Sequence, residues 1–128
     1  MNKSVQAGFT LIELVMVIVI LGVLSAVALP KFVAVDADAK QAAISGIAGA
    51  LSSASAINYA SRKANSSNGV AVSTCADVVN ALQGGLPAGA NPAYAVAATS
   101  VGGVNVTKTD CAVTGNGLSA NFTATGIN

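Results

Sequence analysis

The sequence predicts an α+β protein in which one long N-terminal α-helix packs on a small antiparallel β-sheet. The 128 residues are 53% hydrophobic and 9% charged, and the apolar residues gather in one run near the N-terminus. An amphipathic stretch with helical spacing follows that run, and short alternating segments separated by glycine turns follow the amphipathic stretch. A chain of this length fits a single unit better than several domains.

The apolar run covers residues 9–30, FTLIELVMVIVILGVLSAVALP, and Glu13 is its one charged residue. As a helix it would be about 33 Å long, which is enough to cross a bilayer. The run is apolar on every face, and a chain of this size cannot wrap it completely. We therefore expect a membrane-spanning helix and not the buried core helix of a soluble protein.

After Lys31 the helical pattern becomes amphipathic. Five apolar residues recur at spacings of three and four and predict one buried face: Ile44, Ile47, Leu51, Ala54 and Ile57. The helix is expected to continue to about Ala60. Residues 31–128 would then comprise the amphipathic half of the helix and a globular head.

The elements of the head are predicted from turn signals and alternation. Residues 62–68 form a polar connector, residues 70–73 a short extended piece, and residues 76–83 a small helix that Gly84-Gly85 stops. Alternating apolar residues then predict three or four antiparallel strands. They lie at Tyr94 and Val96, at Val104 and Val106, at Cys111 and Val113, and at Leu118, Ala120 and Phe122.

Several functions are disfavoured by what the chain lacks. It has no histidine, which removes the commonest general base and the commonest metal ligand. Its net charge is +1 and no basic run is present, so it lacks the phosphate-neutralising surface of a nucleic-acid binder. We expect no enzyme activity, no cofactor, no metal site, and no DNA or RNA as the primary partner.

Two interpretations of the apolar run compete. In the first it is a secretory signal with Lys3 in its n-region and a cleavage site at Ala26-Val27-Ala28. The mature protein would then be a soluble secreted binding domain that begins near Leu29. Against this, a carboxylate such as Glu13 is costly in an apolar segment, and a disposable segment has no evident use for it.

The second interpretation rests on residues 7–14, AGFTLIEL, where a short polar leader ends in glycine just before the apolar run. This motif resembles the class III leader of the type IV pilin family. The resemblance implies that residues 1–8 are a leader, that a prepilin peptidase cuts between Gly8 and Phe9, and that Phe9 is then N-methylated. It also implies that the apolar helix is kept, first in the bacterial inner membrane and later in an extracellular pilus.

Glu13 needs a cation, because an unpaired carboxylate is expensive in lipid. The chain offers no Lys or Arg between Glu13 and Lys31. The resemblance implies that the new amine of Phe9 in a neighbouring copy is the partner, which makes the chain a homo-oligomer in a helical filament. The alternative is that Glu13 reaches the membrane surface unpaired.

Gly22 and Pro30 are the expected points of flexibility. Pro30 has no N–H to give the carbonyl of Ala26, so a helix that passes through it should bend or open. The resemblance implies loss of helical hydrogen bonding between Gly22 and Pro30 in the filament. A static kink is the alternative.

Cys75 and Cys111 are the two cysteines, and both lie in the part expected to be exported. An oxidising compartment favours a disulfide between them, worth about 3 to 4 kcal/mol to a small head. Two unpaired buried thiols are the alternative.

The function expected is that of a structural subunit of a type IV pilus, with roles in adhesion or motility that nothing in the head selects. Its partners would be other copies of itself, the prepilin peptidase and methylase, and the pilus assembly machinery. The alternative of the same family is the major pseudopilin of a type II secretion system. The cysteine pair and the lack of an acidic calcium loop favour the pilus subunit, with the mannose-sensitive haemagglutinin type as one candidate.

Overall fold

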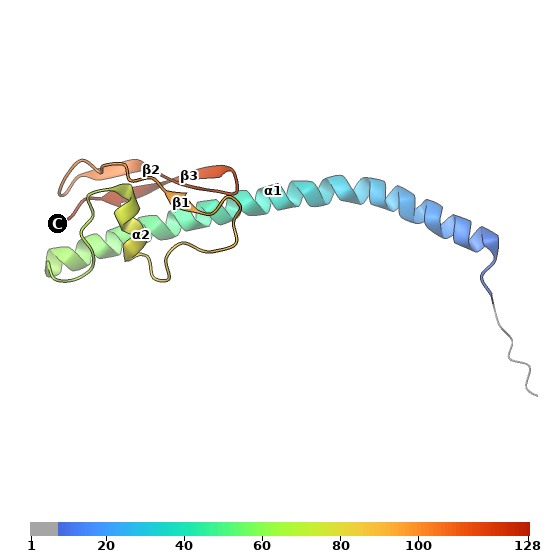
Figure 1. Cartoon of the computed structure of the whole chain (residues 1–128), viewed down its shortest axis with the longest axis horizontal. Coiled ribbons are helices and arrows are strands. Elements are labelled where there is room, and N and C mark those ends of the chain that lie inside the picture. The colour runs from blue at the N-terminus through green and yellow to red at the C-terminus, as the bar shows by residue number, and fades with distance from the viewer. Residues whose placement is uncertain (1–7) are drawn as a thin grey trace, which may run out of the picture. The chain divides into compact units, whose positions relative to one another are not determined.

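The computed structural model describes residues 8–128, so the expected leader, apart from Gly8, lies outside the described residues. The elements are helix α1 (Leu11–Ala64), the 3-10 turn η1 (Cys75–Asp77), helix α2 (Val78–Ala81), and strands β1 (Ala95–Val96), β2 (Thr107–Gly115) and β3 (Leu118–Thr125) (Figure 1). The predicted α+β class is confirmed. The chain divides into two compact units, one ending at Asp38 and the other running from Ala39 to Asn128.

The first unit consists of the N-terminal part of α1. The helix continues without interruption through Pro30, although proline cannot donate to the preceding turn. Every Leu, Ile, Val, Met and Phe side chain from Phe9 to Val35 is between 43% and 89% exposed. Among the described residues, α1 is the one helix long and apolar enough to cross a membrane by length and composition.

The second unit holds the C-terminal part of α1 and the sheet. The strands are antiparallel in the order β1-β2-β3, and Cys111 of β2 faces Phe122 of β3. Asn116 and Gly117 join β2 to β3 with φ angles of 53° and 75°, which is the combination that a type I′ hairpin turn requires. This agrees with the glycine turns that we expected between the alternating segments.

The expected strand at Val104 and Val106 is wrong. Val106 N–H donates to the Gly103 carbonyl at 3.3 Å, and Asn105 has a φ of 65°. The chain therefore turns there, and β2 begins only at Thr107. The expected extended piece at residues 70–73 does pair, because Val72 and Ile127 exchange backbone hydrogen bonds of 2.8 and 3.0 Å.

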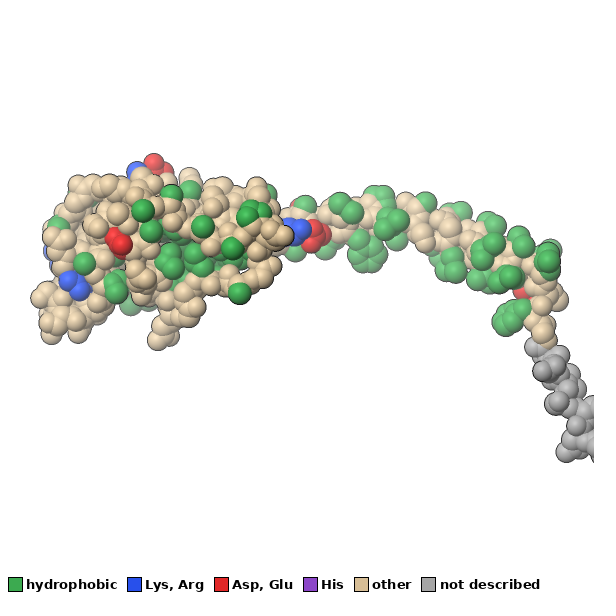
Figure 2. Space-filling model, viewed as in Figure 1, with side chains coloured by type: hydrophobic (Ala, Val, Ile, Leu, Met, Phe, Trp, Pro, Cys, Tyr) green, Lys and Arg blue, Asp and Glu red, His purple; other side chains and the backbone are tan. Residues whose placement is uncertain are grey.

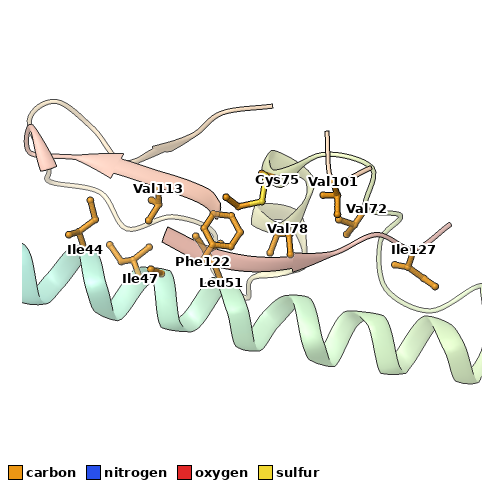
Figure 3. Close-up of a cluster of buried hydrophobic side chains, with 13 residues drawn as sticks. Ile44, Ile47, Leu51, Val72, Cys75, Val78, Val101, Val113, Phe122 and Ile127 are labelled. Carbon is orange, nitrogen blue, oxygen red and sulfur yellow. A yellow bond between two sulfur atoms is a disulfide. The ribbon is translucent and has the colours of Figure 1, made fainter. Parts of the chain in front are cut away.

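A single hydrophobic core lies between the sheet and α1. Figure 3 shows Ile44, Ile47 and Leu51 pointing from the helix toward Val113 and Phe122 of the sheet. Ile44, Leu51 and Val113 are fully buried. Each buried aliphatic side chain of this size contributes about 1.5 to 3 kcal/mol, so this contact holds the sheet on the helix.

The buried face of α1 departs from the predicted one in its second half. Ile57 was expected in the core but is 70% exposed, whereas Ser55 and Asn58 are buried. Both are polar, so an apolar pattern cannot reveal them. The helix end was also placed too early, because α1 continues to Ala64 and carries Arg62 and Lys63 in its last turn, where cations are favourable.

Buried and half-buried polar groups of α1 form hydrogen bonds with the backbone beside them. The hydroxyl oxygens of Ser52 and Ser55 accept from the N–H groups of Thr123 and Thr125 at 3.0 and 2.9 Å. The Asn58 amide donates to the Val70 carbonyl and accepts from the Val70 N–H, both at 2.8 Å. The helix thus satisfies N–H groups along β3 that would otherwise be unpaired.

Candidate assembly site

The candidate site begins where the chain enters α1. Gly8, Phe9 and Thr10 precede the helix, and the Phe9 side chain is 89% exposed. Leu14 N–H donates to the Thr10 carbonyl at 3.2 Å. Thr10 is therefore the residue that caps the helix, and it is the second residue after the expected cleavage point between Gly8 and Phe9.

Thr10 and Glu13 bind each other reciprocally. The Thr10 N–H and hydroxyl donate to Oε2 of Glu13 at 2.8 and 2.9 Å, and the Glu13 N–H donates to the Thr10 hydroxyl oxygen at 3.3 Å. This is a capping box, in which the Thr10 and Glu13 side chains each accept from a backbone N–H group that the helix itself leaves unpaired. It fixes the carboxylate at the positive end of the helix dipole.

The capping box adds a residue that the sequence analysis missed. A Thr followed three residues later by Glu, directly before an apolar run, is the known sequence signature of this arrangement. The partner predicted for Glu13 is a cation of another molecule, and that prediction does not include Thr10. In the described part of the chain, the hydrogen bonds to Glu13's carboxylate reach Oε2 alone, so Oε1 stays available for an external donor.

The surface beside this site is apolar. Figure 2 shows hydrophobic side chains along the N-terminal part of α1, which comprises the exposed residues between Phe9 and Val35. A continuous apolar surface of this length marks a membrane or protein contact. This surface can be buried in lipid or against other helices.

Gly22 and Pro30 lie further along the same helix. A Cβ added at Gly22 would meet nothing within 4 Å, so no contact in this chain explains the glycine. Nearby, the Ser25 hydroxyl donates to the Leu21 carbonyl at 2.7 Å, a bond that slightly weakens the helical ladder. The expected opening of the helix between Gly22 and Pro30 stays a prediction.

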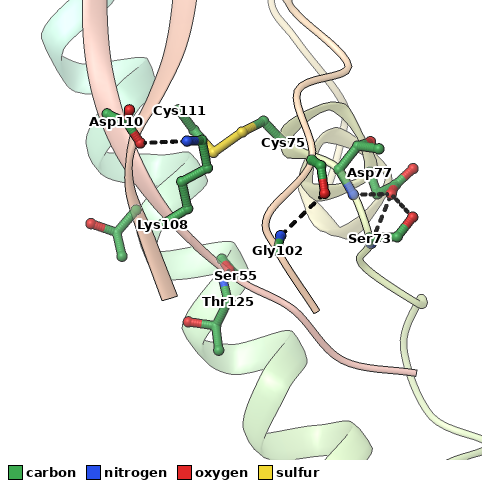
Figure 4. Close-up of a disulfide and its surroundings, with 12 residues drawn as sticks. Ser55, Ser73, Cys75, Asp77, Gly102, Lys108, Asp110, Cys111 and Thr125 are labelled. Carbon is green, nitrogen blue, oxygen red and sulfur yellow. Dashed lines mark hydrogen bonds and ion pairs between the residues drawn. A yellow bond between two sulfur atoms is a disulfide. The ribbon is translucent and has the colours of Figure 1, made fainter. Parts of the chain in front are cut away.

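Cys75 and Cys111 form the disulfide that was expected, with their Cα atoms 5.6 Å apart. Figure 4 shows that it joins the η1 turn to β2. Both cysteines are 1% exposed, so the bridge belongs to the core. The alternative of two unpaired thiols is wrong.

Asp77 holds the segment that carries Cys75. Its Oδ2 accepts from the Thr74 N–H at 2.7 Å and from the Ser73 N–H and hydroxyl at 2.9 and 3.0 Å. The Thr74 backbone bond is the largest cause that lowers the pKa of Asp77, and the Ser73 bonds add to it. Beside Cys111, the hydrogen bond and charge of Lys108 lower the pKa of the exposed Asp110, whose Oδ1 lies 2.9 Å from Lys108 Nζ.

The predicted site residues thus fall into three places. Gly8, Phe9 and Glu13 lie together at the helix start, Gly22 and Pro30 lie along the apolar surface, and the cysteines lie in the head. Within residues 8–128, no group of three or more His, Cys, Asp or Glu side chains is arranged to hold a metal ion.

Comparison with known proteins agrees with the motif. Residues 3–29 match the family of the prokaryotic N-terminal methylation motif. The type IV narrow pilus major component PilA5 of Thermus thermophilus is 42% identical over 82 residues, which cover 64% of this chain and 65% of that protein. The fimbrial protein EcpC of Eikenella corrodens is 62% identical over 32 residues, 25% of this chain and 21% of that protein.

Each match spans less than two thirds of the relative's own length. No solved structure matches the chain. The chain carries the N-terminal methylation motif of prokaryotic pilins and is similar to a type IV pilin over most of its length.

Proposed function

We propose that this chain is the structural subunit of a type IV pilus, processed at its N-terminus and polymerised through α1. The observation that carries the proposal is the exposed apolar surface from Phe9 to Val35 with one carboxylate at its start. Such a surface needs lipid or other helices to cover it. A helix that is kept after processing is covered in both settings, first by lipid in the inner membrane and then by other helices in an extracellular filament.

Processing is the first step of the proposal. A prepilin peptidase cuts between Gly8 and Phe9, residues 1–8 leave as the leader, and the new amine of Phe9 is methylated. Gly8 and Phe9 precede the helix and are exposed, so the peptide bond between them lies outside the helix, where a peptidase can reach it. The matched methylation motif at residues 3–29 supports this step.

Assembly follows from the chemistry of Glu13. Thr10 occupies Oε2 of the carboxylate, and the positive amine of Phe9 from a neighbouring copy binds the remaining oxygen. Burial among apolar helices strengthens this pair, because little water competes for either charge. The contact between the Phe9 amine of one copy and the Glu13 carboxylate of the next then fixes the axial offset between the two copies. The assembly machinery supplies subunits, and the head domain stays on the outer surface.

The first experiment removes the carboxylate. Glu13→Ala should leave membrane insertion and cleavage intact but abolish filament growth, as electron microscopy and shearing of surface filaments would reveal. Asp38→Ala is the matched control, because it removes an exposed carboxylate of the same helix and should leave filaments normal. Abundant normal filaments from Glu13→Ala would refute the assembly role.

Mass analysis of the mature N-terminus is the second experiment. Methylated Phe9 is expected. A mature chain that begins at Leu29 would instead indicate a soluble secreted domain, and an uncut chain would contradict the processing step.

The major pseudopilin of a type II secretion system would share the same processing and helix. Deleting the gene separates the two roles. Loss of surface filaments with normal protein secretion supports the pilus, whereas loss of secretion without loss of surface filaments supports the pseudopilin.

A further inference from the structure

The turn after α1 contains an Asn-Gly pair that the proposed function does not use. Asn68 N–H donates to the Asn65 carbonyl at 3.0 Å, and Asn68 and Gly69 are both exposed. Across residues 8–128, no hydrogen bond reaches the side-chain amide of Asn68. This amide is therefore free to react.

Asparagine before glycine is the dipeptide most prone to deamidation, because glycine has no Cβ to shield its backbone nitrogen. The nitrogen of Gly69 attacks Cγ of Asn68, ammonia leaves, and a succinimide ring forms. Water then opens the ring at either carbonyl carbon. The product is aspartate or isoaspartate, each with one new carboxylate, and no oxidant is needed.

We propose that Asn68 is a site of spontaneous deamidation and that Arg62 captures its isoaspartyl product. Arg62 Nη1 donates to the backbone carbonyl of Asn68 at 3.1 Å. The guanidinium thus already faces this carbonyl, and its second terminal nitrogen, Nη2, lies at the same end of the planar group.

Isoaspartate changes which atoms carry the charge. In that product the main chain runs through the former side chain, and the former backbone carbonyl carbon becomes the free carboxylate. The oxygen that already accepts from Arg62 Nη1 therefore becomes part of an anion. Its second oxygen can accept from Nη2, and a two-point pair between guanidinium and carboxylate is stronger than the neutral bond it replaces. When water attacks the ring at this carbonyl carbon, negative charge develops on the oxygen that faces Arg62, and the guanidinium stabilises that charge. Attack there gives isoaspartate, so Arg62 favours the isoaspartyl product over ordinary aspartate.

The chain contains a matched comparison at Asn116-Gly117. There the Asn116 side chain is held at both ends, because Oδ1 accepts from Asn91 N–H at 2.9 Å and Nδ2 donates to Tyr94 Oη at 3.4 Å. Its amide cannot swing toward the Gly117 nitrogen without breaking these bonds. The same dipeptide should therefore react at one site and persist at the other.

The structure next to Gly69 predicts a consequence. A Cβ built on Gly69 would collide with Oδ1 of Asn58, the atom that accepts from Val70 N–H. Isoaspartate adds a backbone methylene just before this tightly packed residue. We expect the modified turn to weaken the bonds between Asn58 and Val70.

The test incubates the full-length protein, in detergent micelles, in mildly alkaline buffer at body temperature. Peptide mass mapping should find a gain of about 1 Da at Asn68 and none at Asn116. Labelling with an isoaspartyl methyltransferase should locate the isoaspartate at position 68. In urea both pairs should react alike, because the bonds that protect Asn116 are gone. Equal rates at the two sites in the folded chain, or no reaction at Asn68, would overturn the assignment.

Arg62→Met tests the capture, because methionine keeps an aliphatic stem and loses the charge. The share of isoaspartate among the products should fall. Lys63→Met is the matched control, since Lys63 lies over the Tyr59 ring at 5.6 Å and should leave the share unchanged. High salt applied to the unmutated chain should lower the share in the same direction. An unchanged share in both Arg62→Met and high salt would refute the role of Arg62.

Discussion

At the scale of single residues, Thr10 fixes the position of the Glu13 carboxylate. The two residues form a reciprocal capping box at the start of α1. Without the Thr10 hydroxyl, one donor to the carboxylate is lost and the Glu13 N–H loses its acceptor. A free carboxylate can then turn away from the helix axis.

This gives a prediction for Thr10→Val, which has nearly the same shape and lacks the hydroxyl. Filament yield should fall while cleavage after Gly8 continues, as measured by sheared filament mass and by immunoblot of the processed chain. Thr10→Ser keeps the hydroxyl and should assemble normally. Equal filament yield from the valine and serine variants would show that the hydroxyl has no role.

A second residue-scale prediction concerns Asp77 and pH. Its hydrogen bonds to Thr74 and Ser73 lower its pKa below the ordinary value of 3.8. A group whose pKa is lower in the folded state stabilises the fold above its unfolded pKa of about 3.9, and this contribution disappears as pH falls through the folded value. The head should therefore lose stability in acid below about pH 4.

The measurement is urea unfolding of the full chain across that pH range. Asp77→Asn should cost about 1 kcal/mol at neutral pH and flatten the acid dependence. Asp38→Asn, in the other unit, should behave like the unmodified chain. An identical acid dependence in Asp77→Asn and the parent would contradict the assignment.

At the scale of elements, the polar residues on the buried face of α1 matter as much as the apolar ones. Ser55 is 2% exposed and accepts from the Thr125 N–H. Removing its hydroxyl leaves a backbone N–H of β3 without an acceptor, in a place that water cannot easily reach.

Ser55→Ala is therefore expected to cost about 1 to 3 kcal/mol of unfolding free energy and to speed hydrogen exchange of the Thr125 amide. Ser53→Ala is the control, because Ser53 is exposed on the same helix and should change stability by no more than about 0.5 kcal/mol. If both variants exchange and unfold alike, the hydroxyl of Ser55 does not hold the strand.

The same helix shows which elements the sequence could predict. Ile44, Ile47 and Leu51 are apolar at helical spacing, and all three are buried. The pattern fails at Ile57, because the partner surface there is the backbone of β3 and Val70, which needs hydroxyl and amide groups. The prediction of a strand at Val104 and Val106 is wrong for a different reason. Two alternating valines resemble a strand, but a turn between Gly103 and Val106 closes first.

At the scale of the whole molecule, the disulfide is the one covalent link between distant parts of the head. It closes a sequence separation of 36 residues, worth about 3 to 4 kcal/mol in the chain-entropy model. Replacing both Cys75 and Cys111 by alanine should lower the denaturation midpoint accordingly, measured by urea unfolding with and without reductant. Reductant should have little effect on the native chain, because both sulfurs are buried. A double variant as stable as the parent would contradict this contribution.

The candidate site was predictable in part. The charge of Glu13 and the apolar run are visible in the letters of the sequence, and the expected disulfide is present. Thr10 was not predicted, because the cost of an unpaired carboxylate in an apolar segment favours a cationic partner over a neutral one three residues away. In our proposal the partner of Oε1 is the Phe9 amine of a neighbouring copy, which is not part of the same chain.

The hydrogen bonds between the serines of α1 and β3 have a consequence for heads that are packed close together. The filament that we propose would place many heads side by side at high local concentration, where an unpaired edge strand would favour pairing between neighbouring sheets. Ser52 and Ser55 already engage the Thr123 and Thr125 amides, so that edge offers fewer vacant donors to an adjacent copy. In that filament we therefore expect the heads to contact one another through side chains and not through strand pairing along β3.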